Sequence, residues 1–127
     1  MINYITLGSD DIAADAPFFD TLVAHLGGKR LMELPHGIIW GTQFGAPSIG
    51  LLKPFNKEAA SVGNGTMVAL NAKSREEVDS TWKLALANGG ADEGAPGERM
   101  PGFYAAYFRS PTGHKFAITK MGWHPQG

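Results

Sequence analysis

Histidines and carboxylates are the side chains that most often hold metal ions or transfer protons, so their spacing is the first test for chemistry. The chain of 127 residues has four histidines, His25, His36, His114 and His124, and no cysteine. No two histidines lie four residues apart on a predicted helix or alternate on a predicted strand, so they form no local metal-binding pair. The lack of cysteine excludes thiolate metal sites, disulfides and a cysteine nucleophile. A metal site built from these histidines would need distant segments or a second chain.

The carboxylates give no catalytic motif either. Half of them gather at two predicted helix starts, where they complement the helix dipole: Asp10, Asp11, Asp15, Glu76, Glu77 and Asp79. No serine lies in a G-x-S-x-G turn. Gly63-Asn64-Gly65 lacks the preceding strand and following helix of a phosphate-binding loop. The sequence therefore assigns no catalytic residue.

Aromatic residues are better candidates for ligand contact. Tyr4, Trp40, Tyr104 and Tyr107 combine a large apolar face with a polar tip, which suits a pocket that orients a small apolar or aromatic molecule. The alternative is that such residues fill the core. For Tyr4 and Trp40 the two interpretations are equally open, whereas Met67 is more typical of core filling.

The charge balance narrows the class of partner. Eleven Lys and Arg against twelve Asp and Glu give a formal net charge of −1, which provides no electrostatic footprint for nucleic acid or an anionic membrane. No apolar run approaches the roughly 20 residues that span a bilayer, and the N-terminus does not resemble a signal peptide. We therefore expect a cytoplasmic protein that binds neither nucleic acid nor a membrane. Lys53 and Arg109 flank strand ends, where solvated positions are expected and contact with an anionic ligand is the alternative.

The elements that position these residues occur twice along the chain. Residues 3–8 predict a strand and a helical stripe follows, which ends at Gly27-Gly28. Residues 66–72 predict a second strand, then a helix capped by Ser74 with Glu77 three residues later and ended by Gly89-Gly90. The offset is 63 positions from Tyr4 to Met67. Pro17 falls inside the first stripe and predicts a helix that is kinked or starts late, near Ala14.

Three more strands follow each double glycine. They are expected at 29–34, 37–44 and 48–53, and again at 91–93, 103–109 and 115–121. The plan is an α+β fold of two βαβββ modules in one domain, with residues 1–55 as the first module, 56–65 as a linker and 66–127 as the second. A βαβββ unit covers one sheet face with its helix and leaves the other face for a partner or a ligand.

The chain resembles the vicinal oxygen chelate superfamily, which includes glyoxalase I, extradiol dioxygenases and bleomycin-resistance proteins. The resemblance spans essentially all residues and is carried by MINYITLGSDDIAADAPFFDTLVAHLG, PSIGLLKPF, GNGTMVAL and FYAAYFRSPTGHKFAI. It implies a glyoxalase/bleomycin-resistance-like fold in which two βαβββ modules form a concave mixed sheet around a small-molecule cavity. It also implies a homodimer, since members commonly pair modules across chains.

In catalytic members, the resemblance implies four metal ligands, usually His or Glu, on the first and last strands of each module. Carried over one at a time, these positions fall on Tyr4, Gly50, Met67 and Ala117. Tyrosine is a poor ligand at neutral pH, methionine is a weak soft donor, and glycine and alanine offer no donor. Strand alternation independently turns Tyr4 and Met67 away from the helices. We therefore expect no metal and no other cofactor.

The leading hypothesis is a protein that binds a small, apolar or aromatic molecule without a metal. Its cavity would be lined by Tyr4, Trp40, Gly50, Met67, Tyr104 and Ala117. The alternative is a superfamily enzyme, a lyase, isomerase or dioxygenase-like protein, with a relocated metal site or metal-free proton transfer by Tyr4; a glyoxalase-like lyase is its most specific form. An interaction module with a filled cavity is a third hypothesis, against which the small residues Gly50, Ala69 and Ala117 argue. The ligand itself is not identified by the sequence.

Overall fold

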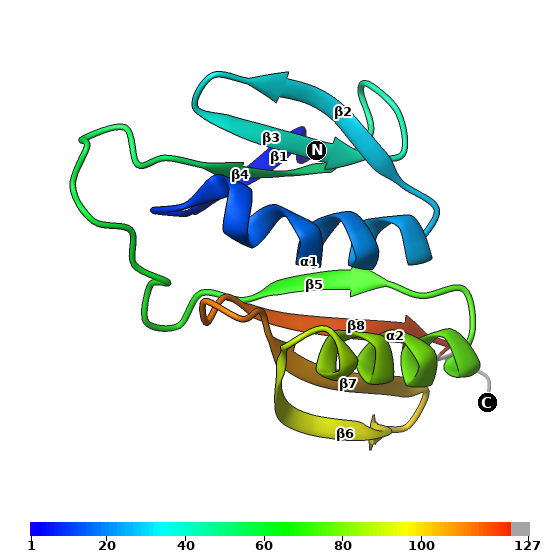
Figure 1. Ribbon diagram of the computed structural model, residues 1–127. Coiled ribbons are helices and arrows are strands. Elements are labelled where there is room, and N and C mark those ends of the chain that lie inside the picture. The colour runs from blue at the N-terminus through cyan, green and yellow to red at the C-terminus, as the bar shows by residue number, and fades with distance from the viewer. Residues whose placement is uncertain (123–127) are drawn as a thin grey trace. The chain divides into compact units, whose positions relative to one another are not determined.

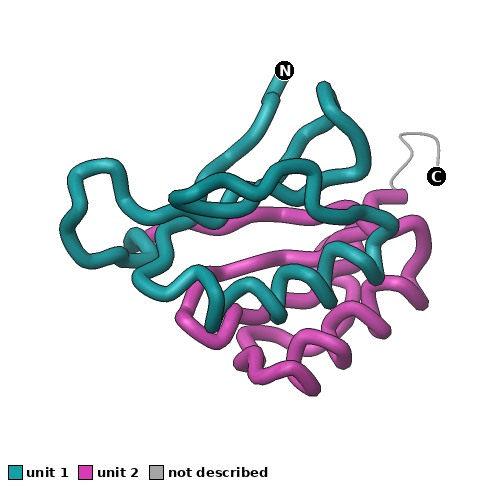
Figure 2. The backbone as a smooth tube through the Cα atoms, turned by 45° about the horizontal axis from the view of Figure 1, so that its top comes forward, with its two compact units in different colours: residues 1–64 teal, residues 65–127 magenta. Residues whose placement is uncertain are grey.

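The computed structural model describes residues 1–122, and the chain divides into two compact units, Met1–Asn64 and Gly65–Gly127 (Figure 2). Each unit has the element order strand, helix and three strands. The α+β class and the repeated βαβββ plan predicted from the sequence are therefore confirmed. His124 lies outside the described residues.

Unit 1 contains a four-stranded mixed sheet and one helix (Figure 1). Its elements are β1 (Tyr4–Gly8), α1 (Ile12–His25), β2 (Lys29–Leu34), β3 (Gly37–Gly41) and β4 (Ser48–Leu52). The strand order is β1-β4-β3-β2, with β1 parallel to β4 and the other neighbours antiparallel. Because β1 and β4 are parallel, their carboxyl ends lie together at one edge of the sheet.

The first helix begins at Ile12, two residues earlier than the late start that Pro17 predicted. The Asp11 side chain caps it by accepting a 3.1 Å hydrogen bond from the Ala14 amide. Pro17 lies inside the helix and cannot donate to the carbonyl of Ala13, four residues earlier. Ala13 and Pro17 are both exposed, so water can satisfy that carbonyl.

Unit 2 repeats the arrangement. Its elements are β5 (Val68–Asn71), α2 (Arg75–Ala87), β6 (Ala91–Met100), β7 (Phe103–Arg109) and β8 (Lys115–Met121), with the strand order β5-β8-β7-β6. Strand β6 is longer than the expected 91–93, because its register shifts at three places break the alternation from which a strand is recognised. Within residues 1–122, neither helix is long and apolar enough to cross a membrane.

Both helices end in the same way at their double glycines. The Gly28 amide donates to the Val23 carbonyl at 2.8 Å, and the Gly90 amide donates to the Ala85 carbonyl at 2.8 Å. The preceding Gly27 and Gly89 have φ values of +88° and +92°, a conformation that glycine adopts without strain. These hydrogen bonds and positive φ values define Schellman motifs. Each helix therefore ends where its glycine adopts the left-handed backbone conformation, as the sequence predicted.

Each helix packs on one face of its own sheet, here called the helix face, and leaves a second, helix-free face (Figure 1). On the helix face of unit 1, Trp40 stacks on Phe19 of α1 with 5.4 Å between ring centroids, and both are 1% exposed. In unit 2, Phe108 stacks on Phe116 at 5.6 Å, and both are fully buried. The largest buried side chains of each unit therefore lie beneath its helix. On the helix-free face of unit 2, the small residues Ala105 and Ala117 are also buried, at 0% and 1% exposure.

Candidate functional site

The helix-free face of unit 1 carries a row of small side chains across three strands. Gly50 on β4 pairs with Thr6 on β1 and with Ile39 on β3. A Cβ built on Gly50 would lie 3.5 Å from the Thr6 Cγ2 and 3.6 Å from the Ile39 Cγ1, which is ordinary contact. The glycine therefore leaves a space about the size of a methyl group between its neighbours. Tyr4, two residues before Thr6 and so on the same face, is 54% exposed.

A pocket of about 800 Å³ begins beside this row, at the carboxyl ends of β1 and β4. Strands β1 and β4 contribute Thr6, Leu7, Gly8 and Leu52 to it, the turn between β2 and β3 contributes His36, and the segment after β4 contributes the rest. That segment is linked to the loop after β1, where the Ala60 amide donates a 2.8 Å hydrogen bond to the Asp10 carboxylate. All lining residues belong to unit 1: Thr6, Leu7, Gly8, His36, Leu52, Lys53, Pro54, Phe55, Asn56, Lys57, Ala59, Ala60 and Ser61. Its size is typical of a small-molecule site.

The helix-free face of unit 2 has an equivalent row. Ala117 on β8 pairs with Ala69 on β5 and with Tyr107 on β7. Two cations lie over the Tyr107 ring: the Arg99 guanidinium at 5.4 Å and the Lys115 ammonium at 5.9 Å from its centroid. The Arg99 guanidinium is held by a 2.6 Å hydrogen bond to the Ala95 carbonyl. This face therefore combines small residues with an aromatic ring and positive charge.

Two of the predicted cavity residues lie on the opposite faces. Trp40 is buried against α1, and its indole Nε1 donates a 2.8 Å hydrogen bond to Asp20 on that helix. Tyr104 also faces its helix, where its hydroxyl donates a 2.6 Å hydrogen bond to Asp79 of α2. The structure thus favours core packing for Trp40, one of the two interpretations that the sequence left open. It does not bring Trp40 or Tyr104 to the face that carries Tyr4 or Ala117.

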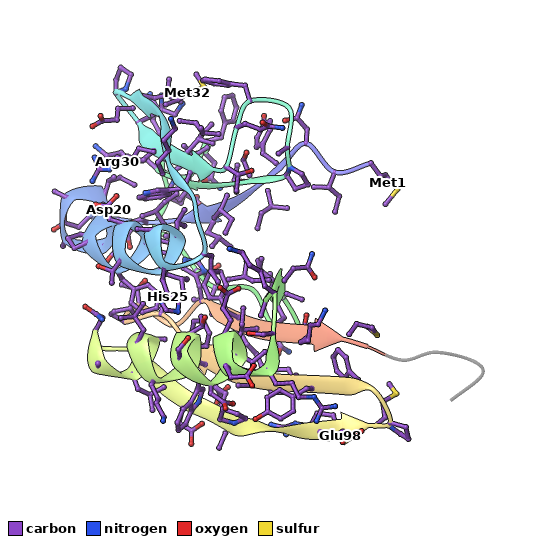
Figure 3. The ribbon with its side chains drawn as sticks, turned by 90° about the vertical axis from the view of Figure 1, so that its right-hand side faces the viewer. Met1, Asp20, His25, Arg30, Met32 and Glu98 are labelled. Atoms are coloured by element: carbon purple, nitrogen blue, oxygen red, sulfur yellow. The ribbon has the colours of Figure 1, made fainter. Side chains whose placement is uncertain are left out.

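Hydrogen bonds to helix carboxylates hold side chains on these helix faces in place. Arg30 on β2 forms a bidentate pair with Asp20, through contacts of 2.7 and 2.8 Å (Figure 3). The hydrogen bond from Arg30 holds the pKa of the Asp20 carboxyl below its usual value, against an opposing effect of burial. The hydrogen bond to Asp79 raises the pKa of Tyr104. These shifts arise from structural contacts between each helix and its sheet.

The four expected metal positions do not supply a ligand set. Gly50 and Ala117 lie within β4 and β8 on helix-free faces, Tyr4 opens β1, and Met67 directly precedes β5. None of the four side chains is a carboxylate or an imidazole, the donors that divalent ions prefer in such sites. In residues 1–122, no three His, Asp or Glu side chains gather closely enough to hold a metal ion. The residues present do not fit the ion that catalytic relatives hold here.

Two features of the site were missed from the sequence. The segment 54–61 was interpreted as mostly linker, yet it forms much of the pocket wall. Tyr107 was named as an aromatic candidate but left out of the predicted cavity, and it, rather than Tyr104, is the tyrosine beside Ala117. Strand alternation could have identified Tyr107, because it is an odd number of residues from Tyr104 and therefore lies on the other face of β7. The role of segment 54–61 depends on the contact between Ala60 and Asp10, 50 residues apart, which has no local signal.

Comparison with known families matches residues 1–118 to the model of the Glyoxalase/Bleomycin resistance protein/Dioxygenase superfamily. A search of curated protein sequences finds no match.

Solved structures agree with this match. A glyoxalase/bleomycin resistance protein from Albidiferax ferrireducens T118 is 29% identical with a TM-score of 0.85, and the alignment covers 94% of this chain and 97% of that one. A glyoxalase/bleomycin resistance protein/dioxygenase family enzyme from Burkholderia phytofirmans PsJN is 20% identical with a TM-score of 0.76, over 94% and 97% of the two chains. A lactoylglutathione lyase from Agrobacterium tumefaciens is 22% identical with a TM-score of 0.68, over 94% and 92%. The last two similarities concern the fold alone.

Proposed function

Since this chain belongs to the Glyoxalase/Bleomycin resistance protein/Dioxygenase superfamily, we propose that it binds a small, apolar or aromatic molecule without a metal ion. The observation that carries the proposal is the pocket of about 800 Å³ in unit 1. It begins at Thr6, beside Gly50 and on the strand that carries Tyr4. The lining includes the half-buried Leu52 and Pro54 and the fully exposed Phe55, whose apolar surface suits an apolar ligand body. Tyr4, Gly50, Met67 and Ala117 remain the predicted contacts on the helix-free faces.

The residue types at the expected metal positions support the metal-free part of the proposal. A tyrosine, a glycine, a methionine and an alanine stand at Tyr4, Gly50, Met67 and Ala117, where catalytic relatives are expected to hold His or Glu. Affinity must then come from apolar contact and a few hydrogen bonds.

The second candidate is an enzyme of the same superfamily, in its most specific form a glyoxalase-like lyase that transfers a proton through Tyr4. It is favoured by one observation: Tyr4 is 54% exposed on a helix-free face, so its hydroxyl is accessible to a substrate. Tyr4→Phe separates the candidates, because it keeps the aromatic ring and removes only the hydroxyl. A binding protein retains its ligand affinity in this variant, whereas an enzyme that uses Tyr4 loses turnover.

The decisive experiment combines elemental analysis with a ligand screen. Protein is purified without chelators or a metal-affinity tag, and its metal content is measured by mass spectrometry. Thermal unfolding is then followed with zinc, nickel, manganese and iron(II), and with a library of small apolar and aromatic compounds. The proposal predicts less than stoichiometric metal, no stabilisation by metal, and stabilisation by a subset of the compounds. Stoichiometric metal that stabilises the fold would overturn the metal-free proposal.

Self-association and location are separate parts of the proposal. We expect a homodimer in solution and a cytoplasmic location, with no nucleic acid or membrane as partner. Sedimentation velocity across a hundredfold range of protein concentration measures the first. A monomer at every concentration would contradict it.

A further inference from the structure

The pocket of unit 1 is basic and contains no carboxylate. His36, Lys53 and Lys57 contribute to its lining, and no aspartate or glutamate does. Lys53 and His36 are neighbours, since the Lys53 amide donates a 2.9 Å hydrogen bond to the His36 carbonyl. Both lysines carry a positive charge at neutral pH, and no ion pair of either is found within residues 1–122. The lining of the pocket therefore carries basic residues and no carboxylate.

The two carboxylates closest in sequence to the pocket wall bond to residues of that wall without lining the pocket themselves. Asp10, between β1 and α1, accepts the 2.8 Å hydrogen bond from the Ala60 amide. Glu58 lies in the same segment but outside the pocket lining, and its carboxylate is 3.5 Å from the Asn56 amide nitrogen. The pocket lining therefore includes both lysines and neither of these two carboxylates.

The segment that carries Lys57 is ordered by local hydrogen bonds. The Lys57 amide donates to the Pro54 carbonyl at 3.0 Å, and the Glu58 amide donates to the Asn56 side chain at 3.0 Å. Lys57 has a φ of 65°, the only positive φ of a non-glycine residue in the described chain, residues 1–122. A turn that holds a lysine in this conformation fixes where its side chain starts. The turn therefore fixes the backbone position from which this exposed side chain extends.

From this arrangement we infer that the pocket binds a small organic anion, with a carboxylate or phosphate group on an apolar body. The inference rests on the proposed function and specifies its ligand class. The anionic group lies between the Lys53 and Lys57 ammonium groups, and the apolar body lies against Leu52, Pro54 and Phe55. His36 adds an imidazole that can donate a hydrogen bond to the anion.

Matched probes test the charge requirement directly. Benzoate and phenyl phosphate are titrated into the full chain by isothermal titration calorimetry, beside the neutral isostere benzamide. We expect the anions to bind at least about tenfold more tightly than benzamide, and their affinity to fall with added salt. Tighter binding of phenyl phosphate than of benzoate would indicate that the two lysines together bind a doubly charged group. Equal affinities would indicate that the pocket binds a group with one negative charge. Either result supports an anion site.

Variants assign the binding to this pocket. Lys53→Gln and Lys57→Asn each remove one charge, and asparagine tolerates the positive φ at position 57. We expect each to weaken benzoate binding about two- to fivefold and to leave benzamide unaffected. Lys29→Gln is the matched control, because it changes the net charge by the same amount. Lys29 pairs with Gly41, at the end of the sheet away from the pocket. Gly8→Val should abolish binding, since even a Cβ at Gly8 would lie 3.1 Å from the Ala60 Cβ.

The outcomes separate this inference from the proposed function. Benzamide binding as tightly as benzoate, with no effect of Lys53→Gln or Lys57→Asn, would overturn the anion site and leave the binding function intact. Equal weakening by Lys29→Gln would also overturn it, because the effect would then come from net charge. Failure of every compound in the broad screen would overturn the proposed function itself. Circular dichroism of each variant confirms that the fold is retained.

Discussion

The indole Nε1 of Trp40 donates a 2.8 Å hydrogen bond to the carboxylate of Asp20, which joins a buried sheet residue to the helix above it. The same carboxylate accepts two hydrogen bonds from Arg30 on the neighbouring strand. Unit 2 has a similar link, in which Tyr104 of the sheet donates to Asp79 of the helix. In both units an aromatic side chain on the helix face is oriented by a helix carboxylate. These aromatics therefore serve the fold, and ligand contact is left to the helix-free faces.

Asp20→Asn should destabilise unit 1 by about 1–2 kcal/mol, because Arg30 loses its bidentate partner and the neutral amide binds it less strongly. Arg30 lowers the pKa of Asp20 below its ordinary 3.8. The ionised carboxylate therefore stabilises the fold above that value, and this contribution is lost as the pH falls through the lowered pKa. Urea unfolding at a series of pH values from about 6 to about 2 measures both effects.

The control for this variant is Glu33→Gln. Glu33 also contacts Arg30, at 2.9 Å, but its side chain is 70% exposed. Solvent screens such a contact, so the free energy of unfolding should change by less than about 0.5 kcal/mol. An equal loss in the two variants would show that burial of Asp20 contributes nothing.

Tyr104→Phe should cost about 1 kcal/mol, the net value of the hydrogen bond to Asp79. The Asp79 carboxylate raises the pKa of Tyr104 above its ordinary 10.0. The stabilising contribution is therefore complete below about pH 10 and is lost as the pH rises through the raised pKa. Unfolding in urea at pH 8 and at pH 11 should show a smaller alkaline loss in the variant than in the wild type. Tyr107→Phe is the control, because the Tyr107 hydroxyl makes no hydrogen bond within residues 1–122; a matching change there would refute the assignment.

The fold was predictable from the sequence because its signals are local. Ser74 and Glu77 mark a helix start by hydrogen bonds to amides at most four residues away. Gly27 and Gly89 mark helix ends by their positive φ. Such contacts depend on neighbours in the chain, so their spacing is visible in one sequence. The start of α1 was missed because Pro17 was given more weight than the cap at Asp11.

The candidate site was less predictable because it depends on which face of a strand a residue occupies. Alternation correctly separates Tyr4 from Leu7 within β1, yet an aromatic residue on either face of a strand suits a pocket equally well by type alone. Asp20, the hydrogen-bond partner of Trp40, lies 20 residues away on α1, and no local sequence pattern predicts this contact. The wall of the unit 1 pocket likewise depends on the contact from Ala60 to Asp10, 50 residues apart. Long-range contacts of this kind are set by tertiary packing.

Gly90→Ala should destabilise unit 2 by about 2–3 kcal/mol. A Cβ at this position would lie 2.7 Å from the Ala85 carbonyl oxygen and 2.8 Å from the Arg109 carbonyl oxygen. Both are backbone atoms, so the helix end and the strand would have to move apart. Gly50→Ala is the control, since its Cβ would lie 3.4 Å or more from every neighbour and should change the free energy of unfolding by less than about 1 kcal/mol. Equal losses in chemical denaturation would contradict the steric argument.

Tyr4→Ala and Trp40→Ala should have opposite profiles in stability and ligand binding. Trp40 is 1% exposed and stacks on Phe19, so its truncation should cost about 3–5 kcal/mol. Tyr4 is 54% exposed, so its truncation should cost less than about 1 kcal/mol while it removes a predicted ligand contact. Urea unfolding and calorimetric titration with a stabilising compound from the broad screen measure the two quantities on the same preparations. A Tyr4→Ala variant that unfolds like Trp40→Ala, or binds that compound like the wild type, would remove Tyr4 from the candidate site.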